Sequence, residues 1–415
     1  MKLNRLLISG YKNLIDFDFL LENFNVLVGV NNSGKSNILE VFKFLDEFLN
    51  GSDETRFHLF SGRMPESTYF RTYGRKRKNI DLLKIDIEFS EIIKEIEYKY
   101  WYSIQIQLAE TKLKDTKPGF IKHESFKYKA KKSTGPSITI FERDVEKVNR
   151  IGGNNKGLTL EKGQPAISII NKLKEIKESL DIPAQIGLAA IFIICKTPVL
   201  YSAPEIIRGN IKSIFRKGKI SCASHRLLAL ELDNEIDTIL KSKSKEMFLQ
   251  VVSSLLDIKD IEPIRMGTED EASSPILFTN IVFNNGARSF LEMVSDGTLA
   301  TLNLITYLIS TKYPIIAIEE PENSIHPKLL RMLIDIIKNN FSDRQILITT
   351  HSPILLNMVN ISDISIVKLD NCGIASVERV LNKKDLVKRL SGPFASHEDI
   401  FYDLEENIDI CPDEN

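Results

Sequence analysis

Residues 29–36 constrain this chain more than any other stretch, because they read GVNNSGKS and fit the phosphate-binding loop pattern G-x-x-x-x-G-K-[ST] at every position. The apolar stretch 25–28 before the loop predicts a short buried strand, and apolar residues at helical spacing through 37–49 predict a helix after it. In that setting, the backbone N–H groups of the loop and the positive end of the helix face an anion. The stretch therefore predicts a phosphate-binding site, and its flanks disfavour a chance glycine turn.

The side chains of the loop carry the chemistry expected of a nucleotide site. Lys35 is expected to reach the β- and γ-phosphates of ATP, and Ser36 is expected to ligate Mg²⁺. The cofactors that the loop predicts are therefore ATP and Mg²⁺. Further residues of the loop and of the helix start complete the predicted nucleotide site: Asn31, Asn32, Ser33, Gly34 and Asn37.

A second motif, far along the chain, has the chemistry for hydrolysis. Residues 314–320 read PIIAIEE, which predicts a buried strand that ends in two acids. A carboxylate at the strand tip can hold Mg²⁺ through water, and its neighbour can orient the water that attacks the γ-phosphate. We assign Glu319 to the metal and Glu320 to the attacking water. The alternative is that two glutamates merely cap a strand in solvent, and the phosphate loop favours the functional interpretation.

Two further motifs carry candidate site residues. The apolar strand 345–350 ends at His351, where ligands bind in open α/β sheets, so His351 is a candidate donor to a γ-phosphate oxygen. Upstream, residues 295–298 read SDGT and precede a helical pattern. Ser295 and the amides near Gly297 would form another anion site at the start of that helix. An ordinary helix cap is the alternative for SDGT.

Composition bounds the class of protein. The 415 residues are 43% hydrophobic and 27% charged, which is typical of a globular chain, and the length favours two or three domains. The net charge of -1 gives no global attraction to nucleic acid. The N-terminus leads into an alternating strand rather than a signal peptide, and no apolar run approaches the roughly 20 residues that span a bilayer, so no membrane partner is expected. The scattered cysteines lack C-x-x-C spacing, which favours a reduced, cytoplasmic setting over structural zinc: Cys195, Cys222, Cys372 and Cys411.

Hydrophobic periodicity divides the chain into four expected parts. Period-two alternation predicts an antiparallel strand block over 82–89, 99–108, 120–131 and 137–141. Mainly helical spacing then predicts a helical insertion, after which strands resume and lead into α/β alternation from Gly297. The expected parts are an N-terminal ATPase lobe at 1–166, the helical insertion at 167–256, a C-terminal ATPase lobe at 257–397 and an acidic tail at 398–415.

The order of these motifs resembles the head of ABC-type ATPases, and more narrowly the SMC/RecF/OLD group of such ATPases. Besides the phosphate loop, the resemblance rests on YKN at 11–13, SDGT at 295–298, IIAIEEPENSIHP at 315–327 and THSP at 350–353. The patterns EEPExxxHP and THSP resemble those of prokaryotic OLD-like members. The resemblance covers residues 1–50 and 275–370 well. It implies an α/β fold, namely an ABC-type P-loop ATPase head with an antiparallel β block and a helical insertion.

The resemblance also implies an assembly. In such ATPases two heads clamp two nucleotides, so a homodimer or a higher oligomer is expected here. Carried over to this sequence, Ser295 and Gly297 would touch the γ-phosphate bound by the other head, and residues 323–326 would form the dimer-crossing loop. Lys12 or Asn13 would lie near the nucleotide base.

The sequence departs from the ABC pattern in several places. Glu319 stands where ABC heads commonly have aspartate, and no glutamine is a convincing Mg²⁺ sensor, because Gln105 and Gln107 lie inside a predicted strand. Long heptad arms are missing, which excludes a long coiled-coil SMC. The remainder after His351 is too short for the TOPRIM domain of OLD nucleases, so no intrinsic nuclease activity is expected.

Three functions compete. The first is a slow ATPase that acts as a switch or scaffold for a separate effector, a nuclease or toxin, in prokaryotic antiphage (antiviral) defence, with 167–256 as the effector dock. The second is a RecF-like DNA-repair ATPase that clamps duplex DNA. Basic stretches at 71–78, 112–132 and 208–219 fit such a nucleic-acid surface, and solvated faces or loops explain them equally well. The third is a transporter subunit, which the missing LSGGQ motif disfavours. We expect the first function.

Overall fold

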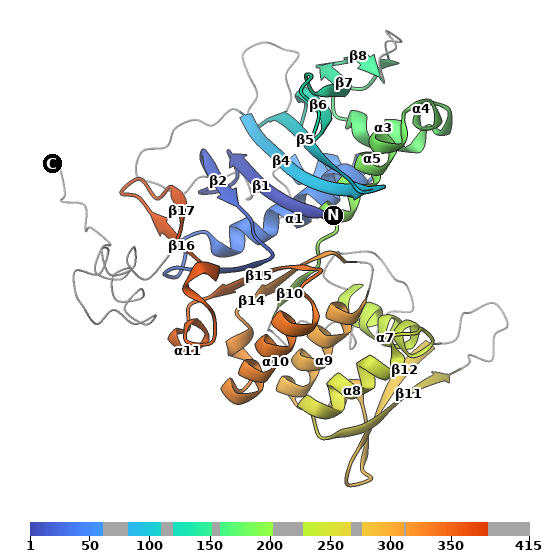
Figure 1. Ribbon diagram of the computed structural model, residues 1–415, viewed down its shortest axis with the longest axis vertical. Coiled ribbons are helices and arrows are strands. Elements are labelled where there is room, and N and C mark those ends of the chain that lie inside the picture. Colours follow the sequence, from blue (N-terminus) through green and yellow to red (C-terminus); the bar gives the residue numbers. More distant parts are fainter. Residues whose placement is uncertain are drawn as a thin grey trace. The chain divides into compact units, whose positions relative to one another are not determined.

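The computed structural model describes residues 1–60, 82–108, 119–151, 158–201, 227–266, 276–310 and 313–380 (Figure 1). The chain divides into two compact units. The first contains Met1–Thr197, Gln345–Leu347 and the described residues from 360 onward, and the second contains Pro198–Arg344 and Ile348–Val359. The predicted acidic tail at 398–415 lies outside the described residues.

The first unit contains an eight-stranded antiparallel sheet, which confirms the antiparallel block predicted from the sequence. In sheet order, its strands are β2 (Phe17–Leu20), β1 (Lys2–Ser9), β4 (Leu82–Ile93), β5 (Ile96–Gln107), β6 (Ile121–Ala130), β7 (Ile138–Asp144), β8 (Lys147–Ile151) and β9 (Leu158–Thr159). Strands β4 and β5 extend further toward the turn between them than the predicted strands 82–89 and 99–108. Lys94 and Glu95, with φ of 47° and 67°, make that turn in two residues.

The helices of the first unit are α1 (Lys35–Asn50), α2 (Asp53–Phe60), α3 (Ala166–Lys172), α4 (Lys174–Ser179) and α5 (Ile182–Cys195). They pack on one another, and α5 packs on strands β5 and β6 of the sheet. The close approach of α5 to β5 requires Gly187, because a Cβ there would lie 2.3 Å from Cε1 of Tyr100. Tyr100 stacks on Phe89 of β4 with 4.8 Å between the ring centroids. Its hydroxyl donates to the carbonyl oxygen of Pro183 at 2.9 Å, so the contact is both apolar and polar.

A buried ion pair joins the sheet to α3. Glu124 on β6 and Arg143 on β7 have fully buried side chains, with 3.7 Å between Oε2 and Nη1. The Glu124 carboxylate accepts from the backbone N–H of Ala166 at 2.6 Å and from that of Ile167 at 3.1 Å, so it caps α3. Burial raises the pKa of Glu124 and lowers the pKa of Arg143, because both charges are removed from water. The hydrogen bonds to Glu124 offset part of that penalty.

Three further strands of the first unit support the phosphate loop. They are β3 (Phe24–Val28), β16 (Ile364–Leu369) and β17 (Ala375–Arg379). β3 pairs with β16 in parallel, and β16 pairs with β17 in antiparallel orientation. All the residues of β3 after Phe24 are buried, as the apolar run before the loop predicted. The loop therefore begins at the carboxyl end of a buried parallel strand, where α/β folds bind ligands.

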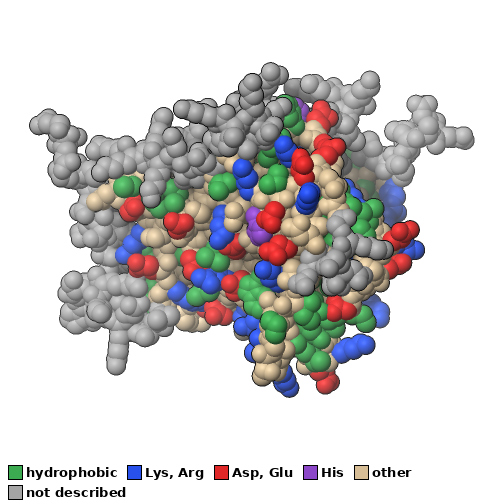
Figure 2. Space-filling view, turned by 90° about the horizontal axis from the view of Figure 1, so that it is seen from above, with side chains coloured by type: hydrophobic (Ala, Val, Ile, Leu, Met, Phe, Trp, Pro, Cys, Tyr) green, Lys and Arg blue, Asp and Glu red, His purple; other side chains and the backbone are tan. Residues whose placement is uncertain are grey.

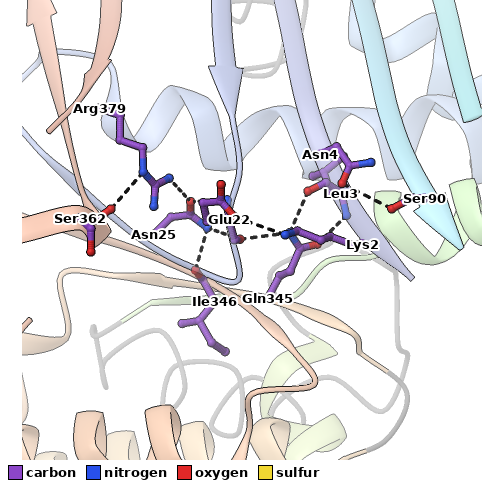
Figure 3. A network of polar contacts seen from close by, with 10 residues as sticks. All are labelled: Lys2, Leu3, Asn4, Glu22, Asn25, Ser90, Gln345, Ile346, Ser362 and Arg379. Atoms are coloured by element: carbon purple, nitrogen blue, oxygen red, sulfur yellow. Dashed lines mark hydrogen bonds and ion pairs between the residues drawn. The ribbon is translucent and has the colours of Figure 1, made fainter. Parts of the chain in front are cut away.

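Side-chain amides join the ends of three strands in this unit (Figure 3). Gln345 is the first residue of β15 (Gln345–Thr350). Its Nε2 donates to the carbonyl oxygens of Leu3 at 2.8 Å and Glu22 at 3.1 Å, and its Oε1 accepts from the N–H of Leu3 at 2.5 Å. Asn25 of β3 donates to the carbonyl oxygens of Glu22 at 2.8 Å and Ile346 at 3.3 Å. Gln345 is therefore a structural amide of the strand junction.

In the second unit, β14 (Ile315–Glu319) has β10 (Val199–Tyr201) and β15 as its neighbours. A separate antiparallel sheet consists of β11 (Ile258–Met266), β12 (Ile276–Phe283) and β13 (Arg288–Phe290). The helices include α7 (Leu227–Leu240), α8 (Lys245–Leu255), α9 (Asp296–Ile309), α10 (Pro327–Asn340) and α11 (Pro353–Leu356). α9 is buried from Leu299 to Ile309, because it is apolar on all sides. Even so, no helix in the described ranges is long and apolar enough to cross a membrane.

The predicted helical insertion at 167–256 is divided between the two units. Helices α3 to α5 belong to the first unit, whereas β10, α7 and α8 belong to the second. Residues 202–226 lie outside the described part of the chain. The division falls at Pro198, directly before β10 pairs in parallel with β14. Strand pairing, which helical periodicity does not reveal, thus takes the second half of the segment into the second unit.

Candidate nucleotide site

The loop at 29–36 connects β3 to α1 and has a backbone that only glycine permits at two positions. Gly34 has a φ of 108°, and a Cβ there would lie 2.9 Å from the side-chain amide of Asn13. At Gly29, a Cβ would lie 2.4 Å from the carbonyl oxygen of Val367. Both distances are shorter than any real Cβ contact. Gly29 is therefore required by close backbone packing and Gly34 by its positive φ, as the motif predicts.

Lys35, the first residue of α1, is buried inside the curve of this loop. Its Nζ donates to the carbonyl oxygens of Gly29 at 2.6 Å and Val30 at 3.0 Å. The helix that starts here has no side-chain cap at Gly34 and no acidic residue in its first turn. The first turn of α1 itself therefore supplies no carboxylate that would neutralise the helix dipole. An ammonium group, glycine amides and a helix N-terminus without acids fit the phosphates of a nucleotide.

The other loop residues predicted for the site differ in exposure. Asn31, Asn32 and Ser36 are exposed, whereas Ser33 is fully buried and Asn37 is intermediate. Asn32 has a φ of 64°, which places it in the left-handed region. Ser36 follows Lys35 at the first turn of α1, so its exposed hydroxyl fits the metal role that the motif assigns to it.

Asn13 and Lys12 brace the loop from the turn after β1. The Asn13 side chain is buried, donates to the carbonyl oxygen of Ser33 at 3.3 Å and accepts from Nδ2 of Asn37 at 2.7 Å. Lys12 forms an ion pair with Glu40 of α1. The structure thus brings both residues next to the loop and its helix. Their expected proximity to the nucleotide base stays a prediction.

In the second unit, the predicted acids lie at the end of β14. Glu319 is the last residue of the strand, and Glu320 follows with a φ of 45°. Its N–H still donates to the carbonyl oxygen of Thr349 on β15, at 3.0 Å. A left-handed conformation at a non-glycine residue costs about 1–3 kcal/mol and is typical of functional sites. This turn directs the Glu320 side chain toward two partners.

Each oxygen of the Glu320 carboxylate has its own neighbour. Oε2 accepts from Nδ2 of Asn323 at 2.9 Å. Oε1 lies 3.1 Å from Nδ1 of His351. Nδ1 has no hydrogen-bond partner among the described residues, so its approach to Glu320 is a close contact rather than a directed hydrogen bond. The contact of Glu320 with Asn323 is a directed hydrogen bond. The structure thus brings together Glu320 and His351, which the sequence predicted separately.

Glu322 completes this group of side chains, although no role of its own was predicted for it. Its Oε1 accepts from Oγ1 of Thr350 at 2.5 Å and from the N–H of His351 at 3.2 Å. In the sequence, Glu322 stands out only as the third glutamate of the EEPE motif at 319–322. No local pattern predicts that an acid in one turn reaches the end of another strand.

Ser295 and Gly297 lie at the start of α9. Ser295 is exposed and is the N-cap, because its Oγ accepts from the N–H of Thr298 at 3.3 Å. A Cβ at Gly297 would lie 3.0 Å from the carbonyl oxygen of Ser324, so this glycine permits close packing against the turn after β14. Within one chain, SDGT therefore acts as an ordinary helix cap. The expected contact with a second nucleotide stays a prediction.

The model of the family described as AAA ATPase domain matches residues 1–356. The chain matches no curated protein. Among solved structures, it is similar to an Smc head bound to the C-winged helix domain of ScpA, at 15% identity and a TM-score of 0.53, with 92% of this chain and 99% of that chain covered.

Two further solved structures have lower TM-scores. One is the SMC head domain from Thermotoga maritima, at 13% identity and a TM-score of 0.43, with 92% of this chain and 100% of that chain covered. The other is an Smc head domain with an extended coiled coil bound to the C-terminal domain of ScpA derived from Pyrococcus furiosus. It has 13% identity and a TM-score of 0.46, with 91% of this chain and 96% of that chain covered. The similarity to the ScpA-bound head with a TM-score of 0.53 shows the fold, which is an SMC-like ABC-type P-loop ATPase head as the motif order predicted. The narrower OLD-like resemblance stays a prediction.

Proposed function

Because the chain belongs to the AAA ATPase domain family and is an ATPase of the SMC-head type, we propose that it is a slow, ATP-dependent switch for a separate effector. The active form is a homodimer or higher oligomer that binds ATP with Mg²⁺. The effector is a nuclease or toxin, and the setting is prokaryotic antiphage defence. The helices of 167–256 are the candidate effector dock.

The observation that carries the hydrolytic part of this proposal is the position of the Glu320 carboxylate. It is held by Asn323 on one oxygen and faces His351 with the other. A carboxylate in this position can orient a water molecule and accept its proton. The imidazole can donate to a phosphate oxygen. The ends of β14 and β15 thus supply a base, Glu320, and a hydrogen-bond donor, His351. Glutamates that merely cap a strand in solvent would need no such partner.

The remaining roles follow from the residues at the loop. Lys35 would neutralise phosphate charge, and the glycine backbone of 29–36 would donate its N–H groups to phosphate oxygens. Ser36 and Glu319 are the residues we assign to Mg²⁺. The ion, when bound, would neutralise the charge that develops on the phosphates.

The switch part of the proposal rests on linkage. ATP can move the protein between open and closed heads only through its different affinity for the two states. Glu320→Gln keeps the shape and hydrogen bonding of the side chain but removes its negative charge, so the ATP-bound state should persist. Lys35→Ala should not reach that state at all. A switch therefore gives different effector output in these two variants.

The test is a pull-down of the protein encoded by the adjacent gene, with wild type, Glu320→Gln and Lys35→Ala, alongside ATP hydrolysis by the wild type. We expect Mg²⁺-dependent hydrolysis and effector binding or activity that differs between the variants. Equal effector retention and equal output in both variants would leave a passive scaffold. Absence of hydrolysis by the wild type would contradict the enzymatic part.

We further propose that the chain has no nuclease activity of its own. Of the acids after His351, Asp363 takes part in a capping box with Asn360. Asp370 accepts from the backbone N–H groups of Cys372 at 2.9 Å and Ile374 at 2.8 Å. These contacts stabilise turns rather than present a metal site. Cleavage of DNA or RNA by purified protein with Mg²⁺, lost on substitution of Asp363 or Asp370, would contradict this proposal.

The RecF-like alternative finds less support in the described residues. Of the three basic stretches, 71–78 and 208–219 lie outside them. In the described part of 112–132, Lys131 pairs with Glu97 at 2.6 Å, and Lys127 lies 4.0 Å from Glu142. Figure 2 shows acidic and basic side chains interspersed over one face of the molecule. Among the described residues of that face, such mixing gives no single-sign field for a DNA backbone.

A further inference from the structure

Glu322 reaches from the turn after β14 to the end of β15. It lies in η4 (Pro321–Asn323), and its side chain is only 11% exposed. A single oxygen, Oε1, accepts from the hydroxyl of Thr350 at 2.5 Å and from the backbone N–H of His351 at 3.2 Å. The acid therefore ties the last residue of β15, and the residue that follows it, to the turn that carries Glu320.

The contact continues one residue further. Thr350 is fully buried, and its Oγ1 accepts from the backbone N–H of Ser352 at 2.9 Å while its own proton goes to Glu322. The three residues from Thr350 to Ser352 are thus all fixed by one connected set of hydrogen bonds. This set determines the backbone position from which the His351 ring extends.

Among the described residues, no directed hydrogen bond reaches Nδ1 of the His351 ring. Its side chain is 41% exposed, and its Nδ1 lies 3.1 Å from Glu320 and 3.8 Å from Glu322 without a directed hydrogen bond. The ring is therefore placed mainly by its backbone, which Glu322 and Thr350 hold. A misplacement of about 1 Å near a reacting group can cost roughly a hundredfold in rate.

We propose that Glu322 and Thr350 are positioning residues that fix the backbone of His351 and thereby set its imidazole against Glu320. Neither needs to contact nucleotide. The proposal concerns hydrolysis and so rests on the proposed function, but the arrangement itself exists in the protein without nucleotide. It can therefore be tested by a readout that does not depend on activity.

Thr350 offers a matched pair of variants that leaves every charge in place. Thr350→Val removes the hydroxyl at nearly constant volume, and Thr350→Ser retains it. We expect kcat for ATP to fall about tenfold in Thr350→Val, which corresponds to loss of one well-placed hydrogen bond. The Kd for ATP should stay within about twofold, and Thr350→Ser should stay within about threefold of the wild-type kcat.

Glu322 is tested in the same way. Glu322→Gln keeps an oxygen acceptor for both donors, and Glu322→Ala keeps none. Glu322→Gln is expected to retain more activity than Glu322→Ala. The other carboxylate oxygen, Oε2, is buried without a hydrogen-bond partner among the described residues, so an amide nitrogen there displaces no existing bond.

The second readout is the imidazole NMR signal of His351 in nucleotide-free protein, assigned by its absence in His351→Gln. We expect this signal to shift in Thr350→Val and Glu322→Ala and to stay at its wild-type position in Thr350→Ser. Equal kcat in Thr350→Val and wild type, or an unshifted signal, overturns the proposal. Equal loss of kcat in Thr350→Ser and Thr350→Val overturns it as well. If wild type does not hydrolyse ATP, the proposed function fails, and the His351 signal still decides this inference.

Discussion

The side-chain amide of Asn323 donates a hydrogen bond to Oε2 of Glu320 at 2.9 Å. Residues 323–326 are predicted to cross a dimer interface, and the first of them binds the catalytic candidate of its own chain. The two interpretations are compatible, because a loop that holds Glu320 in one head can also meet a second head. The same residue could thus link closure of the dimer to the position of the attacking water.

Asn323→Ala should therefore lower kcat for ATP roughly tenfold or more, since a hydrogen bond to a charged group is worth about 1.5–3 kcal/mol. The Kd for ATP should not change, because Lys35 and the loop are untouched. Steady-state hydrolysis and calorimetry measure the two quantities. Asn340→Ala, at the exposed end of α10, is the control. A loss of ATP affinity without loss of kcat would assign Asn323 to nucleotide binding instead.

Lys35→Ala should reduce ATP affinity by an order of magnitude or more. The substitution removes a charge expected to face several phosphate charges, and charge-assisted hydrogen bonds contribute roughly 1.5–3 kcal/mol each. Calorimetry with ATP and Mg²⁺ measures the change. Lys43→Ala on the same helix is the control, because Lys43 lies beside Glu47 at 3.9 Å and away from the loop. Affinity equal to that of wild type in Lys35→Ala would remove the loop from the site.

Ser295→Arg should block ATP-dependent dimerisation and spare nucleotide binding. Ser295 is exposed at the start of α9, where a second head is expected to bring its nucleotide. The substitution also removes a helix cap, which costs about 0.5–2 kcal/mol. Ser295→Ala removes the same cap without the bulk and is therefore the control. Sedimentation with ATP should show monomers for Ser295→Arg, and dimers weakened only by the lost hydroxyl contact for Ser295→Ala, because the Gly297 amide remains. A permanent wild-type monomer with full ATPase activity would refute the composite site.

Glu124→Ala should destabilise the first unit by about 3–5 kcal/mol, because it leaves Arg143 buried without its carboxylate and uncaps α3. The single tryptophan of the chain, Trp101 on β5, reports unfolding of this sheet by its fluorescence in urea. Glu142→Ala is the control, since Glu142 is half-exposed and 4.0 Å from Lys127, and such surface pairs contribute about 1 kcal/mol or less. Equal urea midpoints for the two variants would show that the buried pair does not stabilise the unit.

The local parts of the fold were predictable because their signals are local. The glycines of 29–36, the apolar run of β14 with its terminal acids and the alternation of β4 to β7 are all written in consecutive residues. The spacing of apolar residues and the conformational freedom of glycine act over a few neighbouring residues. The sequence alone therefore determined the loop, the strand ends and the antiparallel block. The motif order then determined the ABC-type head, which the similarity to a solved Smc head confirmed.

Tertiary structure alone decided which side chains meet. Glu322 and Thr350 are 28 residues apart, and Asn13 and Ser33 are 20 apart, so no periodicity in the chain pairs them. The same holds for 167–256, where the pairing of β10 with β14 accompanies the division of the segment between the two units. Hydrogen bonds between distant residues depend on strand order and register. These are set by packing of the whole unit and not by any one stretch of sequence.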